Sequence, residues 1–183
     1  MKKLFLLFAM ALIAHTSCLS QELVSIDDFV ELHSLLQNCL SNKNAKSNYE
    51  KVRPRIVELA EKNGLSLYEY HQYNGMDMWS YNCFLYKKCQ ITKDRTGYPS
   101  FTPTKGGVSM VIDNGFDYIV YSKNSFAQIV DMVKKKCDGK LYTLMEDEEP
   151  TYFYTDGKLC YLVANLRLRL LPMDDSFRDA MKK

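Results

Sequence analysis

The chain has 183 residues, of which 46% are apolar, and its 24 basic residues nearly balance its 22 acidic ones. Two of the basic residues, Lys2 and Lys3, stand at the N-terminus, so the remainder carries 22 basic residues against 22 acidic ones. This balance argues against a nucleic-acid partner, which would require a positive excess or a concentrated basic stripe. The apolar fraction suffices for one hydrophobic core, so we expect a single domain over residues 21–183.

The first 20 residues have the composition of a bacterial-type secretion signal. Two lysines precede an apolar run over residues 4–14, which is too short to cross a membrane as a helix. Small residues at Cys18 and Ser20 favour cleavage before Gln21, so residues 1–20 are expected to be a signal peptide. The alternative is a lipid anchor at Cys18. In either case we expect an exported protein without a transmembrane segment, either periplasmic or secreted, or held on the outer membrane as a lipoprotein.

Three segments have the apolar spacing of amphipathic helices. The first begins at Ser25, a residue type that caps helix N-termini. The second covers residues 49–63 and contains Pro54, which should kink the helix or mark its first turn. The third begins after Asn124 or Ser125.

Three dipeptides that favour tight hairpin turns separate β-rich segments. They are Asn74-Gly75, Asn114-Gly115 and Asp156-Gly157. If each forms a two-residue turn, the pairing of the flanking strands is fixed. The facing pairs would then be His71 with Met78, Met110 with Ile119, and Phe153 with Cys160.

Residues 158–171 alternate between apolar and polar side chains, which predicts one long, half-buried strand. In such a strand Tyr161, Arg167 and Arg169 would point to one face, and Cys160 would point to the other with the neighbouring leucines.

The order of the predicted elements shows no βαβ alternation. We therefore expect an α+β fold in which hairpins build an antiparallel β-sheet of about six or seven strands, with about three helices packed on one face. A helix followed by strands occurs at residues 56–68 and again at 129–142, which suggests a degenerate duplication with halves at about 21–92 and 107–183. Residues 92–107 are expected to form a long loop between these halves, because they are rich in proline and glycine.

One constellation has the residue types of a soft-metal site. In the two-residue register His71 faces Met78, and Met76 lies two residues along the same face. Imidazole and thioether ligands together select Cu(I) over harder ions. The segment, with Trp79 beside it, resembles the His/Met-x-Met arrangement of small periplasmic copper chaperones, and the resemblance implies a Cu(I) site at His71, Met76 and Met78. The alternative is a methionine-lined core strand.

Aromatic residues are frequent in the same hairpins, with 13 tyrosines in the chain. Tyrosine and tryptophan on a sheet face suit recognition, because their rings bury a large area at little entropic cost. The residues expected to share one face of the first hairpin are Tyr68, Tyr70, Trp79 and Tyr81. Those expected to form a second exposed surface on the last hairpin are Tyr152, Tyr154, Tyr161, Arg167 and Arg169. The alternative is an ordinary arrangement of core and rim.

Five cysteines follow the signal segment, so at least one of them has no intramolecular disulfide partner. We favour a disulfide between Cys137 and Cys160, and the alternative is a set of buried free thiols.

The sequence contains no HExxH, GxSxG, P-loop or GxGxxG motif. Its histidines after the signal segment are His33 and His71. We therefore expect an exported, non-catalytic interaction module that needs no cofactor and binds a protein or peptide partner through a Tyr-rich sheet face. The alternative is a periplasmic protein that binds a small ligand or Cu(I) through His71, Met76 and Met78. An unrecognised hydrolase is a third, weaker hypothesis.

Overall fold

The computed structural model describes residues 23–40, 43–73, 75, 79–146 and 149–182. The predicted signal peptide, Cys18, Asn74, Met76 and Met78 lie outside the described residues. Within the described ranges, no helix is long and apolar enough to cross a membrane.

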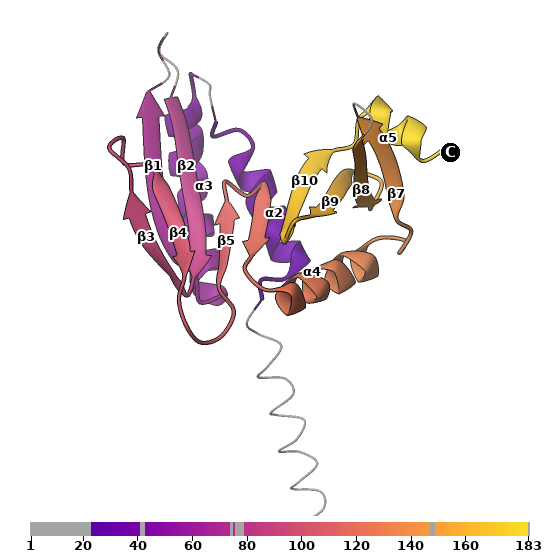
Figure 1. The fold of residues 1–183 in the computed structure, drawn as a ribbon. Coiled ribbons are helices and arrows are strands. Elements are labelled where there is room, and N and C mark those ends of the chain that lie inside the picture. Colours follow the sequence, from indigo (N-terminus) through magenta and orange to yellow (C-terminus); the bar gives the residue numbers. More distant parts are fainter. Residues whose placement is uncertain (1–22, 41–42, 74, 76–78, 147–148, 183) are drawn as a thin grey trace, which may run out of the picture.

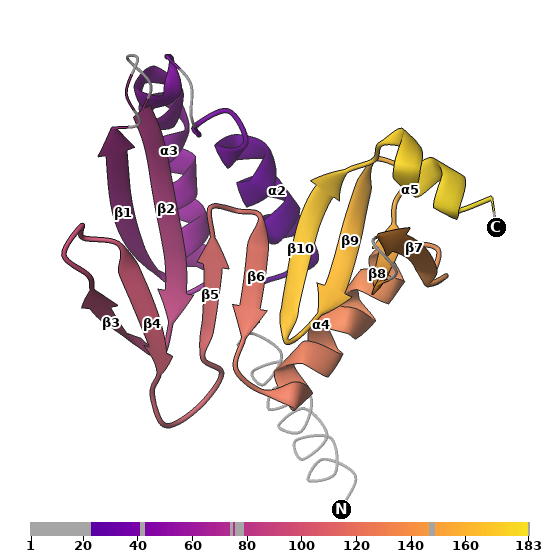
Figure 2. The same cartoon turned by 45° about the horizontal axis from the view of Figure 1, so that its top comes forward.

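An antiparallel sheet of eight strands dominates the fold, in the order β1-β2-β5-β6-β10-β9-β8-β7 (Figure 2). Its strands are β1 (Ser66–Tyr73), β2 (Trp79–Lys87), β5 (Met110–Asp113), β6 (Asp117–Val120), β7 (Tyr142–Glu146), β8 (Glu149–Thr155), β9 (Leu159–Ala164) and β10 (Arg167–Pro172). A separate two-stranded sheet consists of β3 (Cys89–Lys93) and β4 (Pro99–Pro103). The helices are α2 (Ile26–Leu36), α3 (Ala45–Lys62), α4 (Lys123–Lys136) and α5 (Asp175–Ala180). The expected α+β class with an antiparallel sheet is confirmed, with more strands and one more helix than expected.

The helices begin where local side chains satisfy their first backbone N–H groups. The Ser25 side chain accepts a hydrogen bond from the backbone N–H of Asp28 at 3.1 Å, so the predicted first cap is confirmed. Helix α4 is capped in the same way by Ser122, which places its start slightly earlier than expected. Pro54 lies inside α3, which continues through it.

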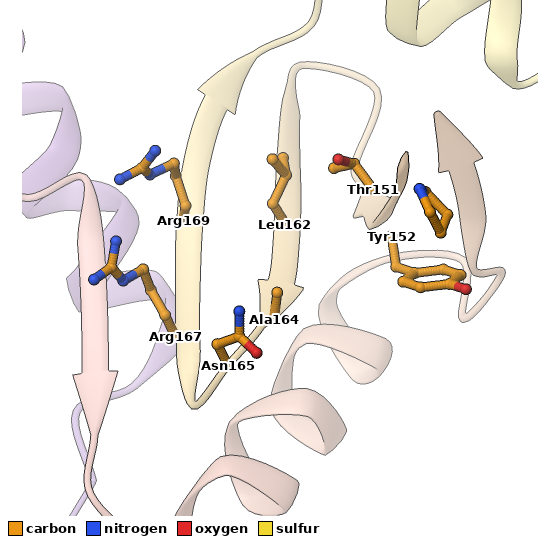
Figure 3. Close-up of a pocket in the computed structure, with 8 residues that line it drawn as sticks. Thr151, Tyr152, Leu162, Ala164, Asn165, Arg167 and Arg169 are labelled. Atoms are coloured by element: carbon orange, nitrogen blue, oxygen red, sulfur yellow. The ribbon is translucent and has the colours of Figure 1, made fainter. Parts of the chain in front are cut away.

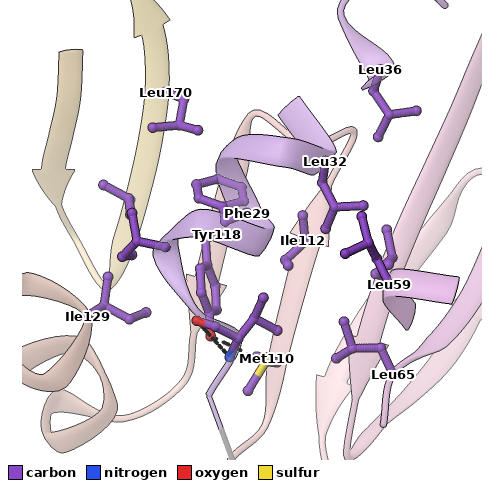
Figure 4. Close-up of a cluster of buried hydrophobic side chains, with 14 of the residues drawn as sticks. Phe29, Leu32, Leu36, Leu59, Leu65, Met110, Ile112, Tyr118, Ile129 and Leu170 are labelled. Atoms are coloured by element: carbon purple, nitrogen blue, oxygen red, sulfur yellow. Dashed lines mark hydrogen bonds between the residues drawn. The ribbon is translucent and has the colours of Figure 1, made fainter. Parts of the chain in front are cut away.

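Helices α2, α3 and α4 pack on one face of the large sheet and build the main core (Figures 1 and 2). Phe29 of α2 meets Tyr118 of β6 edge-to-face at 5.4 Å, as Figure 4 shows. The Tyr118 hydroxyl accepts a hydrogen bond from the backbone N–H of Val24 at 2.7 Å, which satisfies this buried polar group. The main core therefore ties the first described residues to the centre of the sheet.

In the described part of the chain, the opposite face of the sheet is covered at its two ends. At one end the β3–β4 hairpin lies over β2, where Phe101 contacts Phe84 with ring centroids 5.5 Å apart. At the other end α5 lies over β8, where Phe177 contacts Phe153 at 4.9 Å. Residues 92–107 were expected to form a loop, but much of this segment belongs to the β3–β4 hairpin. We call this side of the sheet the open face.

All three hairpins are longer than two-residue turns would make them, so the predicted registers are wrong. The observed partners are His71 with Tyr81, Met110 with Val120, and Phe153 with Leu162. Side-chain-to-backbone bonds widen these turns; the Asp156 carboxylate, for example, accepts hydrogen bonds from the N–H groups of Lys158 and Leu159, both at 2.9 Å.

Residues 158–171 do not form one strand, because the chain reverses at Asn165 and Leu166 between β9 and β10. Both turn residues have positive φ, 50° and 63°, as a two-residue hairpin turn requires. Ala164 pairs with Arg167 across the turn. The even-numbered residues of β9 therefore share a face with the odd-numbered residues of β10. Tyr161 therefore points to the side opposite Arg167 and Arg169.

The two halves of the sheet share one element order. Helix α3 precedes β1, β2, β5 and β6, with the β3–β4 hairpin inserted, and helix α4 precedes β7, β8, β9 and β10. The last strands of the halves, β6 and β10, pair antiparallel at the centre. The duplication inferred from the sequence stays a prediction.

Candidate functional site

A row of facing residues crosses the open face from strand to strand. Its members are Tyr68, Phe84, Asp113, Asp117, Arg169, Leu162 and Phe153. The aromatic ends of this row lie under the β3–β4 hairpin and α5. Between these covers, the side chains of Arg167 and Arg169 keep 46% and 45% of their surface exposed. Charged residues thus occupy the middle of the open face.

Arg169 and Asp117 form a bidentate ion pair between β10 and β6. The Arg169 Nε and Nη2 atoms donate to the two carboxylate oxygens of Asp117 at 2.8 and 2.7 Å. Asp117 is buried, and this pairing raises the pKa of the Arg169 guanidinium. The Arg167 Nη1 atom stays 3.7 Å from the same carboxylate, beyond hydrogen-bond distance. Asp117 is therefore satisfied mainly by Arg169.

A pocket of about 370 Å³ adjoins these arginines (Figure 3). It is lined by Pro150, Thr151, Tyr152, Leu162, Ala164, Asn165, Arg167 and Arg169. Strand β8 pairs with β9 only over Phe153–Thr155, whereas its residues from Glu149 onward pair with β7. The first part of β8 thus leaves the ladder with β9, and the pocket lies at this divergence.

The pocket combines an apolar floor with a tyrosine on one side and two arginines on the other. Leu162 and Ala164 of β9 lie between Tyr152 on one side and the two arginines on the other, whose guanidinium groups lean toward β6 (Figure 3). The Tyr152 side chain is 45% exposed. No acidic side chain is among the described residues that line the pocket, so the charged groups of this described lining are the two arginines.

Asp113 faces Asp117 across the β5–β6 hairpin. Its Oδ1 atom is buried and has no hydrogen-bond partner within the described part of the chain. Burial raises the pKa of Asp113 to about 6, and the negative charge of Asp117 adds to this effect. Asp113 therefore takes up a proton at a higher pH than an ordinary aspartate does.

The structure brings Tyr152, Arg167 and Arg169 together but removes two tyrosines from the predicted surface. Tyr154 and Tyr161 are buried on the helix-covered side, with 4% and 0% exposure. The Tyr161 hydroxyl donates to Asp156 at 2.7 Å. The expectation that they form an exposed surface is wrong, because the turn between β9 and β10 reverses the alternation.

The predicted aromatic face of the first hairpin is divided between the two sides of the sheet. Tyr68 and Tyr70 lie on the open face, where Tyr70 contacts Tyr98 at 5.5 Å. Trp79 and Tyr81 lie on the helix side, where Tyr81 contacts Tyr49 of α3 at 5.7 Å. The expected common face is wrong, because the observed pairing shifts by an odd number of residues and exchanges the faces of β2.

The register that supported a Cu(I) site is also wrong. His71 faces Tyr81, whose ring centroid lies 4.3 Å away, and it also contacts Tyr49 at 5.8 Å. Met76 and Met78 lie outside the described residues. Among the residues that are described, no group of three His, Cys, Asp or Glu side chains could hold a metal ion.

The five cysteines after the signal segment are free thiols in the structure. Cys160 belongs to the small cluster under α5, whereas Cys137, at the end of α4, packs against the main core. This placement gives no support to a disulfide between Cys137 and Cys160, which stays a prediction.

Sequence reasoning missed Asp113, Asp117 and the apolar floor of the pocket. The signal for the first two was weak, because acidic residues beside a turn are common on solvated surfaces. Comparison of the chain with protein-family models, curated proteins and solved structures gave no match. The functional argument therefore rests on the pocket and its surroundings.

Proposed function

We propose that this protein is an exported, non-catalytic interaction module that binds a protein or peptide segment at the pocket on its open face. The observation that carries the proposal is the meeting of an exposed tyrosine, an apolar floor and two half-exposed arginines at one sheet divergence. Tyrosine and arginine are the residue types that contribute most to protein interfaces. A pocket of about 370 Å³ has the size that accommodates one or two side chains of a partner.

The nearby carboxylates support binding rather than acid–base chemistry. Asp117 is held at both oxygens by Arg169, and neither Asp117 nor Asp113 lines the pocket. A general acid or base must reach the proton that it transfers. The arginines and the tyrosine, in contrast, border the pocket directly.

Site-specific photo-crosslinking tests this proposal. A photoreactive amino acid replaces Tyr152 in the full chain, and a matched variant carries it in place of Tyr73, which is 54% exposed on β1, at the far edge of the sheet. We expect a cross-linked protein partner from position 152 in the native envelope, lost when Leu162→Arg fills the pocket. Equal cross-linking from both positions, or a product that Leu162→Arg leaves unchanged, would contradict the proposal.

A further inference from the structure

The hydrogen-bond capacity of the two arginines is used unequally. A guanidinium group has five N–H donors and no acceptor. Arg169 directs its donors at Asp117, whose two oxygens are thereby occupied. Arg167 makes no side-chain hydrogen bond within the described part of the chain and only the 3.7 Å contact with Asp117. Arg169 thus commits its Nε and Nη2 atoms to Asp117, whereas Arg167 is the arginine at the pocket whose guanidinium has no donor committed to another described residue.

The charges at the pocket also favour an anionic ligand. Both arginines border the pocket, whereas Asp117 and Asp113 lie outside its lining, and no acidic side chain is among the described residues that line it. A cationic group in the pocket would therefore lie next to two guanidinium groups, which repel it. A neutral ligand that covers Arg167 would displace the water that hydrates the N–H donors of this side chain. Unless it supplied acceptors of equal strength in place of that water, the loss would be unfavourable. A carboxylate avoids both penalties, because its two oxygens match the guanidinium fork.

The surroundings of Arg167 also suit the remainder of an acidic side chain. The guanidinium leans toward β6, and its contact with Asp117 is too long and too exposed to hold it strongly (Figure 3). Arg167 can therefore turn toward the pocket at little energetic expense. Leu162 and Ala164 would contact the methylene groups of the incoming residue, and the Tyr152 ring would contact its neighbour.

From this geometry we infer that the bound segment places an aspartate or glutamate side chain in the pocket, with its carboxylate on the guanidinium of Arg167. This inference rests on the proposed function and specifies the chemistry of the partner. Arg169 acts as a positioning residue, because it occupies Asp117 and so leaves Arg167 unneutralised.

The test uses three synthetic tripeptide probes, followed by backbone amide NMR shifts of the full mature chain. The first is N-acetyl-Tyr-Glu-Val with an amidated C-terminus, the second replaces its Glu by Gln, and the third is the Gln peptide with a free C-terminal carboxylate. We expect saturable shifts at Tyr152, Leu162 and Arg167 with the Glu peptide. The amidated Gln peptide should bind about tenfold more weakly, as loss of a hydrogen bond to a charged group implies.

Two variants assign the effect to Arg167. In Arg167→Gln the preference for Glu over Gln should vanish, whereas Arg95→Gln, which removes the same charge from an exposed position in the β3–β4 hairpin, should retain it. Equal affinity of the two amidated peptides for the unaltered protein, or loss of the preference in Arg95→Gln, would overturn the inference. Binding of only the peptide with the free C-terminal carboxylate would also overturn it, in favour of a chain terminus as the ligand.

The outcome also separates this inference from the proposed function. If the cross-linked partner depends on Leu162 but its yield is the same in Arg167→Gln, the pocket binds a partner without using an acidic residue. If no partner is found at Tyr152 while the Glu peptide binds selectively, the carboxylate site exists and the partner assignment fails.

Discussion

The two ends of the open face use the same kinds of residue for different purposes. At the β1–β2 end, Tyr68 packs against the buried Phe84 beneath the β3–β4 hairpin. At the β8–β10 end, Tyr152 stands beside a pocket because β8 departs from β9. The difference teaches that coverage, and not tyrosine content, decides which aromatic residues are available to a partner.

The prediction with the largest expected effect on stability compares the removal of one ring from each end of the open face. Phe84→Ala should lower the free energy of unfolding by about 3 kcal/mol, because Phe84 is 2% exposed and contacts three rings. Tyr152→Ala should lower it by less than about 1 kcal/mol, because that side chain is half exposed. Denaturant unfolding of both variants measures the difference, and equal losses would remove the distinction between a structural and an available end.

A second test compares the two arginines within the pocket region. Arg169→Ala should lower the free energy of unfolding by about 1–3 kcal/mol, because it leaves the buried Asp117 without its bidentate partner. Arg167→Ala should change it by less than about 0.5 kcal/mol, since the one ion pair of this side chain within the described residues is long, at 3.7 Å, and leaves the arginine half exposed. Thermal or urea unfolding at matched salt gives both values. A larger loss in Arg167→Ala would contradict the division of roles between the two residues.

The third test concerns the carboxylate pair beside the pocket. Asp113 has a folded-state pKa of about 6 against 3.8 for the free group, so ionising it opposes folding above pH 4. Asp113→Asn should therefore stabilise the protein at pH 7.5 by about 1–2 kcal/mol, and the gain should shrink toward zero as the pH falls below about 4. Unfolding curves across this range provide the check. A gain that is the same at both pH values would point to packing instead of charge.

Features that depend on local pattern were predictable from the sequence. The antiparallel α+β class and the Ser25 cap follow from apolar periodicity and from the hydrogen-bonding capacity of a serine before a helix. The hairpin registers were not, because turn length depends on bonds such as those from Lys158 and Leu159 to Asp156. A dipeptide signal marks a reversal without fixing how many residues it contains.

The placement of the candidate site residues was predicted in part, for a related reason. Tyr152, Arg167 and Arg169 were expected together and are together. The reversal at Leu166 gave no local signal, since leucine disfavours positive φ, and tertiary pairing stabilises it: the Leu166 carbonyl accepts a hydrogen bond from Val120 at 3.0 Å. The partner of Arg169 lies 52 positions away at Asp117, so no short-range pattern could reveal it.

The central position of β10 has a consequence for how the protein matures. Strand β10 follows the other strands of the sheet along the chain, yet it lies inside the sheet, between β6 and β9. Until Arg167–Arg169 pairs with β6, β6 is an edge strand whose unpaired backbone N–H and C=O groups can pair with another chain. Because β10 carries Arg167 and Arg169, the pocket is complete only once this strand has docked, and a chain cut short before β10 would lack the pocket and leave β6 as an edge strand prone to aggregation.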